Sequence, residues 1–113
     1  MVARRPADRR EKGLAAMYLL EVLSGPLDGK TWSFERQITI GRDDARAEAC
    51  LALDRYVSRE HARLQIDADA IRLVDLRSRN GTRLNVRAVV GEVALPVGVP
   101  FVVGRTILRV TRA

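Results

Sequence analysis

The chain has 113 residues and a formal net charge of +6, and 47% of its residues are hydrophobic. This length favours one domain, and the apolar content excludes a wholly disordered protein. Cys50 is the single cysteine, which excludes an internal disulfide, and no apolar run approaches the roughly 20 residues that span a bilayer. Without a secretory-type apolar segment near the N-terminus, we expect a cytoplasmic protein.

The first residues differ in composition from the rest. Residues 1–13 carry five basic and two acidic side chains. We expect residues 1–16 to form a flexible basic tail and residues 17–113 to form one folded domain. Because a basic tail can contact nucleic acid, nucleic-acid binding is kept as an alternative function.

After the tail, short apolar and alternating segments are separated by turn residues. The expected strands are 17–23, 31–34, 37–40, 62–66, 71–76, 82–86, 89–93, 100–103 and 106–110. Residues 45–49 are expected to form a short helical turn, and no helix of ordinary length is needed after residue 16. Many short strands with regular turn signals favour an all-β antiparallel sandwich or barrel.

Three polar segments follow strand-like runs and carry the candidate function. They are Gly41-Arg42, Ser58-Arg59-Glu60-His61 and Ser78-Arg79-Asn80-Gly81-Thr82. The last contains Asn-Gly, a hairpin-turn signal, because both residues tolerate positive φ. Together the segments supply a guanidinium, a small hydroxyl and a turn amide, with no metal-ligand cluster. Such groups bind an anion through charge-assisted hydrogen bonds and do no further chemistry on it.

The order and spacing of these segments resemble the forkhead-associated (FHA) domain. The likeness covers about residues 17–110. Residues 38–42 match its Gly-Arg motif, residues 54–64 match Ser-x-x-His with its flanks, and residues 74–82 match Asp-Leu-x-Ser-x-Asn-Gly-Thr. The resemblance implies an eleven-stranded antiparallel β-sandwich with binding loops at one end, and recognition of phosphothreonine.

The resemblance also implies a role for each polar residue that contacts the peptide. Arg42 would bind the phosphate directly, and Ser58 would donate its hydroxyl to a phosphate oxygen. Arg59 and Arg79 would be further cations beside the peptide or phosphate. Asn80 would hydrogen-bond the peptide backbone next to the phosphothreonine.

A second group of residues is expected to support the loops rather than to contact ligand. These residues are Gly41, His61, Ser78, Gly81 and Thr82. His61 would hold the Ser58 loop from beneath by hydrogen bonds, and Asp75 would anchor the neighbouring loops.

Ser58 and His61 could also be interpreted as a hydrolase pair. A triad requires a nucleophile, a base and an orienting group around an oxyanion site, and no Gly-x-Ser-x-Gly motif is present. We therefore predict a non-enzymatic module without cofactor or metal.

The sequence predicts a phosphothreonine-dependent binding module that recruits a protein modified by a Ser/Thr kinase. No threonine precedes Thr31, so the phosphothreonine is expected to come from another protein. The nearest alternative is a scaffold of the same fold that binds its partners without phosphate.

Overall fold

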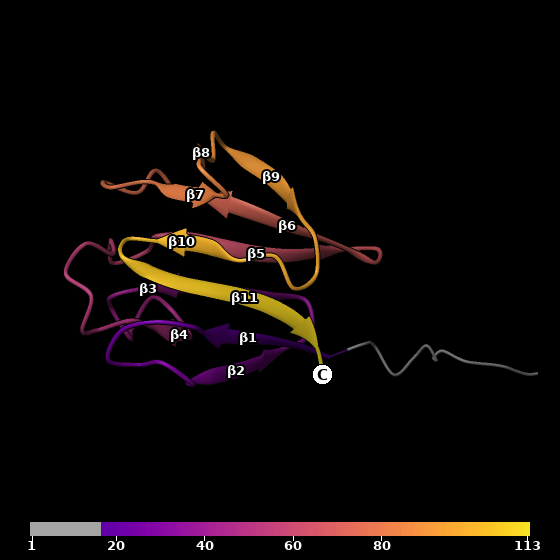
Figure 1. The fold of residues 1–113 in the computed structure, drawn as a ribbon, viewed down its shortest axis with the longest axis horizontal. Helices are drawn as coiled ribbons and strands as arrows, with labels where there is room; N and C mark the ends of the chain where they lie inside the picture. Colours follow the sequence, from indigo (N-terminus) through magenta and orange to yellow (C-terminus); the bar gives the residue numbers. More distant parts are fainter. Residues whose placement is uncertain (1–16) are drawn as a thin grey trace, which may run out of the picture.

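The computed structural model describes residues 17–113, and this part of the chain is built from eleven strands without a helix. The expected tail, residues 1–16, lies outside the described residues. Figure 1 shows the strands stacked in two layers. No helix among residues 17–113 is long and apolar enough to cross a membrane.

The strands form a six-stranded and a five-stranded sheet. The first has the order β2(Thr31–Phe34), β1(Tyr18–Val22), β11(Thr106–Arg112), β10(Phe101–Val103), β7(Thr82–Leu84) and β8(Arg87–Ala88). The second has the order β4(Ala49–Cys50), β3(Gln37–Gly41), β5(Ala62–Asp67), β6(Ala70–Asp75) and β9(Glu92–Leu95). The predicted all-β sandwich is confirmed. All pairs are antiparallel except β3–β4, which pair in parallel.

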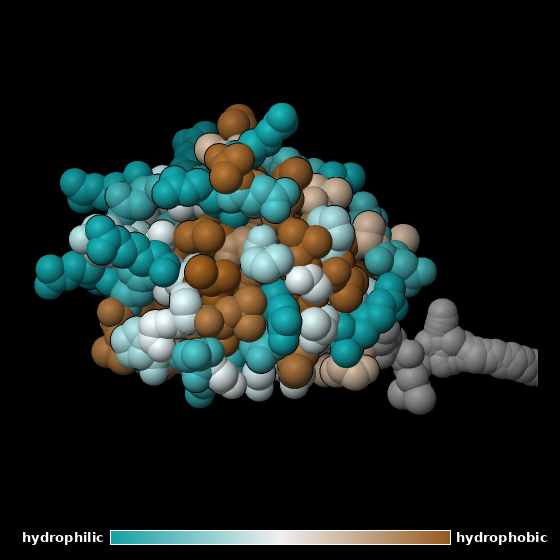
Figure 2. Space-filling view, in the orientation of Figure 1, coloured by the Kyte–Doolittle hydropathy of each residue, from teal (hydrophilic) through white to brown (hydrophobic). Residues whose placement is uncertain are grey.

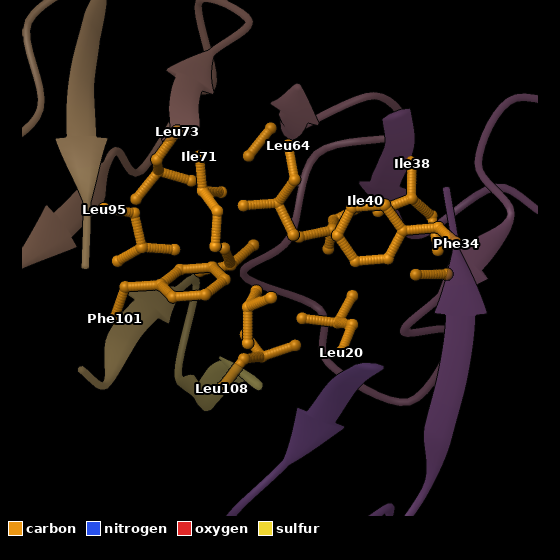
Figure 3. Packing of buried hydrophobic residues seen from close by; sticks show 14 of the residues in the cluster. Leu20, Phe34, Ile38, Ile40, Leu64, Ile71, Leu73, Leu95, Phe101 and Leu108 are labelled. Carbon is orange, nitrogen blue, oxygen red and sulfur yellow. The ribbon is translucent and has the colours of Figure 1, made fainter. Parts of the chain in front are cut away.

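The hydrophobic core lies between the two sheets because alternate residues of each strand point to the same face. In β1, Tyr18, Leu20 and Val22 are buried while the two residues between them are partly exposed. Figure 3 shows Leu20 of the six-stranded sheet below Leu64 of the five-stranded sheet. Burial of one such leucine contributes about 1.5–3 kcal/mol to the free energy of unfolding.

Three segments differ from the sequence expectation. The strand expected at 82–86 ends earlier, because β7 stops at Leu84 and Asn85, with a φ of 58°, turns the chain before β8. The strand expected at 89–93 is wrong: β8 ends at Ala88, Gly91 turns the chain with a φ of 74°, and β9 starts at Glu92. The helical turn expected at 45–49 is a hydrogen-bonded turn on the Asp43 carbonyl, and Ala49 already belongs to β4. Strands of two residues, such as β4 and β8, have too few positions for alternation to appear.

Several connections meet at one end of the sandwich, on the left in Figure 1. They are the β3–β4 loop (42–48), the β4–β5 loop (51–61), the β6–β7 loop (76–81) and the β10–β11 turn (104–105). The β6–β7 loop carries the chain from the five-stranded to the six-stranded sheet. The hairpin interpretation of Asn80-Gly81 is therefore wrong, since β6 and β7 do not pair. Of these two residues, only Gly81 has a positive φ, of 84°.

Candidate functional site

Strand β3 delivers Arg42 to the loop end of the sandwich. Gly41, the last residue of β3, is buried, and a Cβ there would overlap the carbonyl oxygen of Arg59. This close approach lets the Arg42 amide donate to the Ser58 carbonyl at 2.9 Å. The Arg42 side chain in turn donates Nε–H to the Val57 carbonyl at 2.9 Å. The exposed guanidinium is thus held by the β4–β5 loop.

The same loop holds Asn80. Its Nδ2 donates to the Tyr56 carbonyl at 2.9 Å, one residue before the carbonyl that holds Arg42. Two side chains that are distant in the chain therefore rest on adjacent peptide groups. Both Arg42 and Asn80 are exposed.

Ser58 lies next to this pair and links the β4–β5 loop to the β6–β7 loop. Its Oγ accepts the main-chain N–H of Arg79 at 3.0 Å. A hydroxyl that accepts one hydrogen bond keeps its own hydrogen for donation. Ser58 therefore has a donor available for a ligand oxygen. Arg42, Ser58 and Asn80 together form what is called the rim below.

His61 lies beneath the rim and is fully buried. Its Nδ1 accepts the main-chain N–H of Ser58 at 2.9 Å, so Nε2 carries the proton and donates to the Gly81 carbonyl, also at 2.9 Å. Burial lowers the pKa of His61, and the Gly81 carbonyl and the charges of Asp75 and Asp54 only partly offset this effect. The neutral imidazole therefore clamps two loops together.

The β6–β7 loop has its own internal support. Asp75 Oδ1 accepts the hydroxyls of Ser78 at 2.6 Å and Thr82 at 2.8 Å, and Ser78 Oγ accepts the Gly81 amide at 3.0 Å. Thr82 is fully buried, and Asp75 and Ser78 are half-buried. These bonds fix the loop that presents Asn80.

Arg59 and Arg79 are both exposed beside the rim. The two loops bring them there through their backbones, since the Arg59 carbonyl packs on Gly41 and the Arg79 amide binds Ser58. Arg42 and Arg59 also border an open pocket of about 360 Å³. Figure 2 shows hydrophilic residues gathered at the left edge, which is the end that carries the loops in Figure 1.

Comparisons with known proteins identify the fold. A family model described as the cytoplasmic domain of an inner membrane component of T3SS matches residues 21–113. The FHA domain-containing protein FhaB of Mycobacterium tuberculosis is 36% identical over 102 residues, which cover 88% of this chain. The chain spans 63% of the length of FhaB.

Solved structures agree. The FHA domain of CT664 protein from Chlamydia trachomatis matches with a TM-score of 0.78 and 26% identity, over 84% of this chain and 96% of that one. A structure described as an analysis of phosphothreonine-dependent FHA domain interactions matches with a TM-score of 0.73 and 30% identity, over 84% and 95%. The chain belongs to the FHA domain family. The β-sandwich expected from the sequence motifs is the FHA fold.

In this FHA domain the site region extends to residues that the sequence did not single out. Asp54 accepts the amides of Tyr56 and Arg105, both at 2.9 Å, and the hydroxyl of Thr106 at 2.7 Å. Burial raises the pKa of Asp54, but the hydrogen bonds from Thr106, Arg105 and Tyr56 outweigh it and leave the pKa below its ordinary value. Asp54 thus fastens the β10–β11 turn to the β4–β5 loop. Its only sequence signal was its place in the flank of the Ser-x-x-His motif.

Proposed function

We propose that this FHA domain binds phosphothreonine in another protein and recruits that protein without catalysing a reaction. The observation that carries the proposal is the rim, where the β4–β5 loop holds Arg42, Ser58 and Asn80 side by side. A phosphothreonine brings a charge of about −1.5 to −2 and three strong acceptor oxygens. The rim offers a guanidinium, a hydroxyl hydrogen and an amide at one exposed place.

The hydrogen bonds already made at the rim suggest which rim residue binds which part of the phosphothreonine peptide. Arg42 uses Nε on Val57, which leaves the N–H groups of its two terminal nitrogens for phosphate. Ser58 adds its hydroxyl hydrogen. Each such charge-assisted bond contributes about 1.5–3 kcal/mol. Arg59 and Arg79, both exposed, add further positive charge beside the rim.

Asn80 is suited to the peptide backbone rather than to the phosphate. One hydrogen of its Nδ2 is bound to Tyr56, and an amide side chain has a second N–H and an acceptor oxygen. These two groups match the carbonyl and N–H of an extended peptide. Asn80 would therefore fix the peptide beside the phosphothreonine.

The contacts of His61 support the non-catalytic part of the proposal. Both ring nitrogens are bound to main-chain groups, and Ser58 Oγ is bound to the Arg79 amide. A general base must reach the proton it removes, and here neither nitrogen is directed to the hydroxyl. Within residues 17–113, no group of three His, Cys, Asp or Glu side chains could hold a metal ion.

We also propose that the domain acts in the cytoplasm, where a Ser/Thr kinase modifies its partner.

A phosphopeptide library tests the proposal. Peptides carrying phosphothreonine, phosphoserine or unmodified threonine are measured against the wild type and Arg42→Ala. We expect selective binding of phosphothreonine, lost in Arg42→Ala and kept in the control Arg72→Ala. Arg72 lies in β6 of the five-stranded sheet, outside the binding loops, and is paired with Glu92 of β9.

Two results would contradict this function. Equal binding with and without phosphate would indicate the phospho-independent scaffold. Binding of nucleic acid that falls steeply with salt and disappears when residues 1–16 are deleted would favour the tail as the functional element.

A further inference from the structure

The β10–β11 turn places one more arginine beside the rim. The guanidinium of Arg105 lies 4.1 Å from the centroid of the Tyr56 ring. Tyr56 is the residue whose carbonyl holds Asn80. The stacked pair is therefore next to the rim, on the Asn80 side. Arg105 is exposed and Tyr56 is 38% exposed, so the pair is open to a ligand.

The two members of this stack are fixed by one carboxylate. Asp54 accepts the Tyr56 amide with Oδ1 and the Arg105 amide with Oδ2. At Gly104, whose φ is 61°, a Cβ would lie 2.7 Å from Val57 Cγ2, so the turn packs tightly on the β4–β5 loop. A cation that is positioned before binding loses less conformational freedom when it meets its ligand.

The guanidinium of Arg105 carries a charge that the described part of the chain does not neutralise by an ion pair. Arg46, Arg72 and Arg109 each have a carboxylate partner within 4 Å, whereas no ion pair among residues 17–113 includes Arg105. The carboxylate of Asp54 accepts the main-chain N–H of Arg105 and forms no ion pair with the Arg105 guanidinium. Stacking on a ring leaves the edge of the guanidinium free to bind a carboxylate through two N–H groups.

We propose that Tyr56 and Arg105 form a second contact for the bound peptide, one that takes the carboxylate of an Asp or Glu flanking the phosphothreonine. This proposal rests on the proposed function. Arg105 lies on the Asn80 side of the rim, because β10 pairs with β7. On the Arg42 side, the β3–β4 loop carries Asp43 and Asp44, whose charges would repel a peptide carboxylate. The contact therefore serves one side of the phosphothreonine only. The Tyr56 ring holds the guanidinium flat, and the peptide carboxylate binds its edge.

The test is a glutamate scan in a phosphothreonine peptide whose other flanking residues are alanine. Glutamate replaces each flanking alanine in turn, and Kd is measured by fluorescence polarisation. In the wild type we expect glutamate at positions on one side to tighten binding about two- to fivefold, the range of an exposed ion pair. In Arg105→Gln this gain disappears, while the all-alanine phosphopeptide binds as before.

Arg112→Gln is the matched control. Arg112 also stacks on an aromatic ring, with its guanidinium 5.5 Å from the Tyr18 centroid. Arg112 is the last residue of β11 and Arg105 directly precedes the first, so the two arginines lie at opposite ends of this strand. The variant removes the same charge away from the rim and should keep the glutamate gain. Thermal unfolding of both variants shows whether each folds.

The outcomes separate the two proposals. If the all-alanine phosphopeptide fails to bind the wild type, the phosphothreonine function and the second contact both fall. If it binds but glutamate gives no gain, or the gain survives in Arg105→Gln, only the second contact is overturned. An equal loss for glutamate and alanine peptides in Arg105→Gln also overturns it, because the stack would then merely support the loop.

Discussion

Arg42 and Asn80 are bound to neighbouring carbonyl groups of one loop, those of Val57 and Tyr56. The position of each side chain therefore depends on the path of the chain through that loop. His61 fixes this path from below, and Asp54 fixes it from the side of the β10–β11 turn. Changes beneath the rim should consequently weaken ligand binding even though they touch no ligand.

Ser58→Ala tests the hydroxyl at the rim. The variant loses one donor to phosphate and the acceptor of the Arg79 amide. We expect phosphothreonine-peptide affinity to fall about tenfold, which corresponds to a charge-assisted bond of about 1.5 kcal/mol. Isothermal titration calorimetry measures the change, with Ser33→Ala on the exposed edge of β2 as the control. Unchanged affinity in Ser58→Ala would remove this residue from the binding site.

His61→Ala tests the clamp between the loops. The substitution leaves the Ser58 amide and the Gly81 carbonyl without their partner and opens a cavity at a fully buried position. We expect the free energy of unfolding to drop by about 2–5 kcal/mol and the phosphopeptide Kd to rise. Urea denaturation and peptide binding measure the two effects. A stable variant with wild-type affinity would contradict the clamp.

The pH dependence of stability has a clear sign for His61. Because burial lowers its folded pKa below the ordinary value of 6.5, the unfolded chain takes up a proton first as the pH falls. The contribution of His61 is therefore complete above about pH 6.5 and decreases from there down to the folded pKa. Denaturation curves measured at successively lower pH, starting from about pH 6.5, should show a decreasing free energy of unfolding.

His61 is the one histidine of the sequence, which makes the pH experiment specific. In His61→Gln the decrease that begins near pH 6.5 should vanish. The decrease caused by Asp54 should remain, and it starts at more acidic pH, because that group has a pKa lowered from 3.8. An unaltered profile in His61→Gln would show that the imidazole does not titrate as its environment predicts.

Gly41→Ala tests the close approach between β3 and the β4–β5 loop. The added methyl would overlap the Arg59 carbonyl, a backbone atom that cannot rotate away. We expect a loss of about 1–3 kcal/mol in the free energy of unfolding, together with weaker phosphopeptide binding. Gly25→Ala is the control: a Cβ there has open space, so it adds backbone strain from its φ of 77° without moving the rim. Equal effects of the two variants on affinity would refute the specific role of Gly41.

Periodic segments made much of the fold predictable. The alternation of Ala62, Leu64 and Ile66 indicated β5, and 31–34 was predicted with the bounds of β2. The two-residue strands could not be predicted because alternation needs more positions. The Asn80-Gly81 signal was misleading, since a local preference for a turn does not show whether the flanking strands pair.

The sequence by itself determined most of the longer strands of the sandwich and the residue types of the rim, because side-chain alternation and local motifs can be recognised in the sequence alone. The tertiary structure decided which main-chain atoms hold those side chains. It alone brought Arg105 onto Tyr56, 4.1 Å away, and placed His61 between the Ser58 amide and the Gly81 carbonyl. These contacts join residues whose separation in the chain carries no periodic signal, and they exist only once the two sheets have packed and aligned their loops at one end.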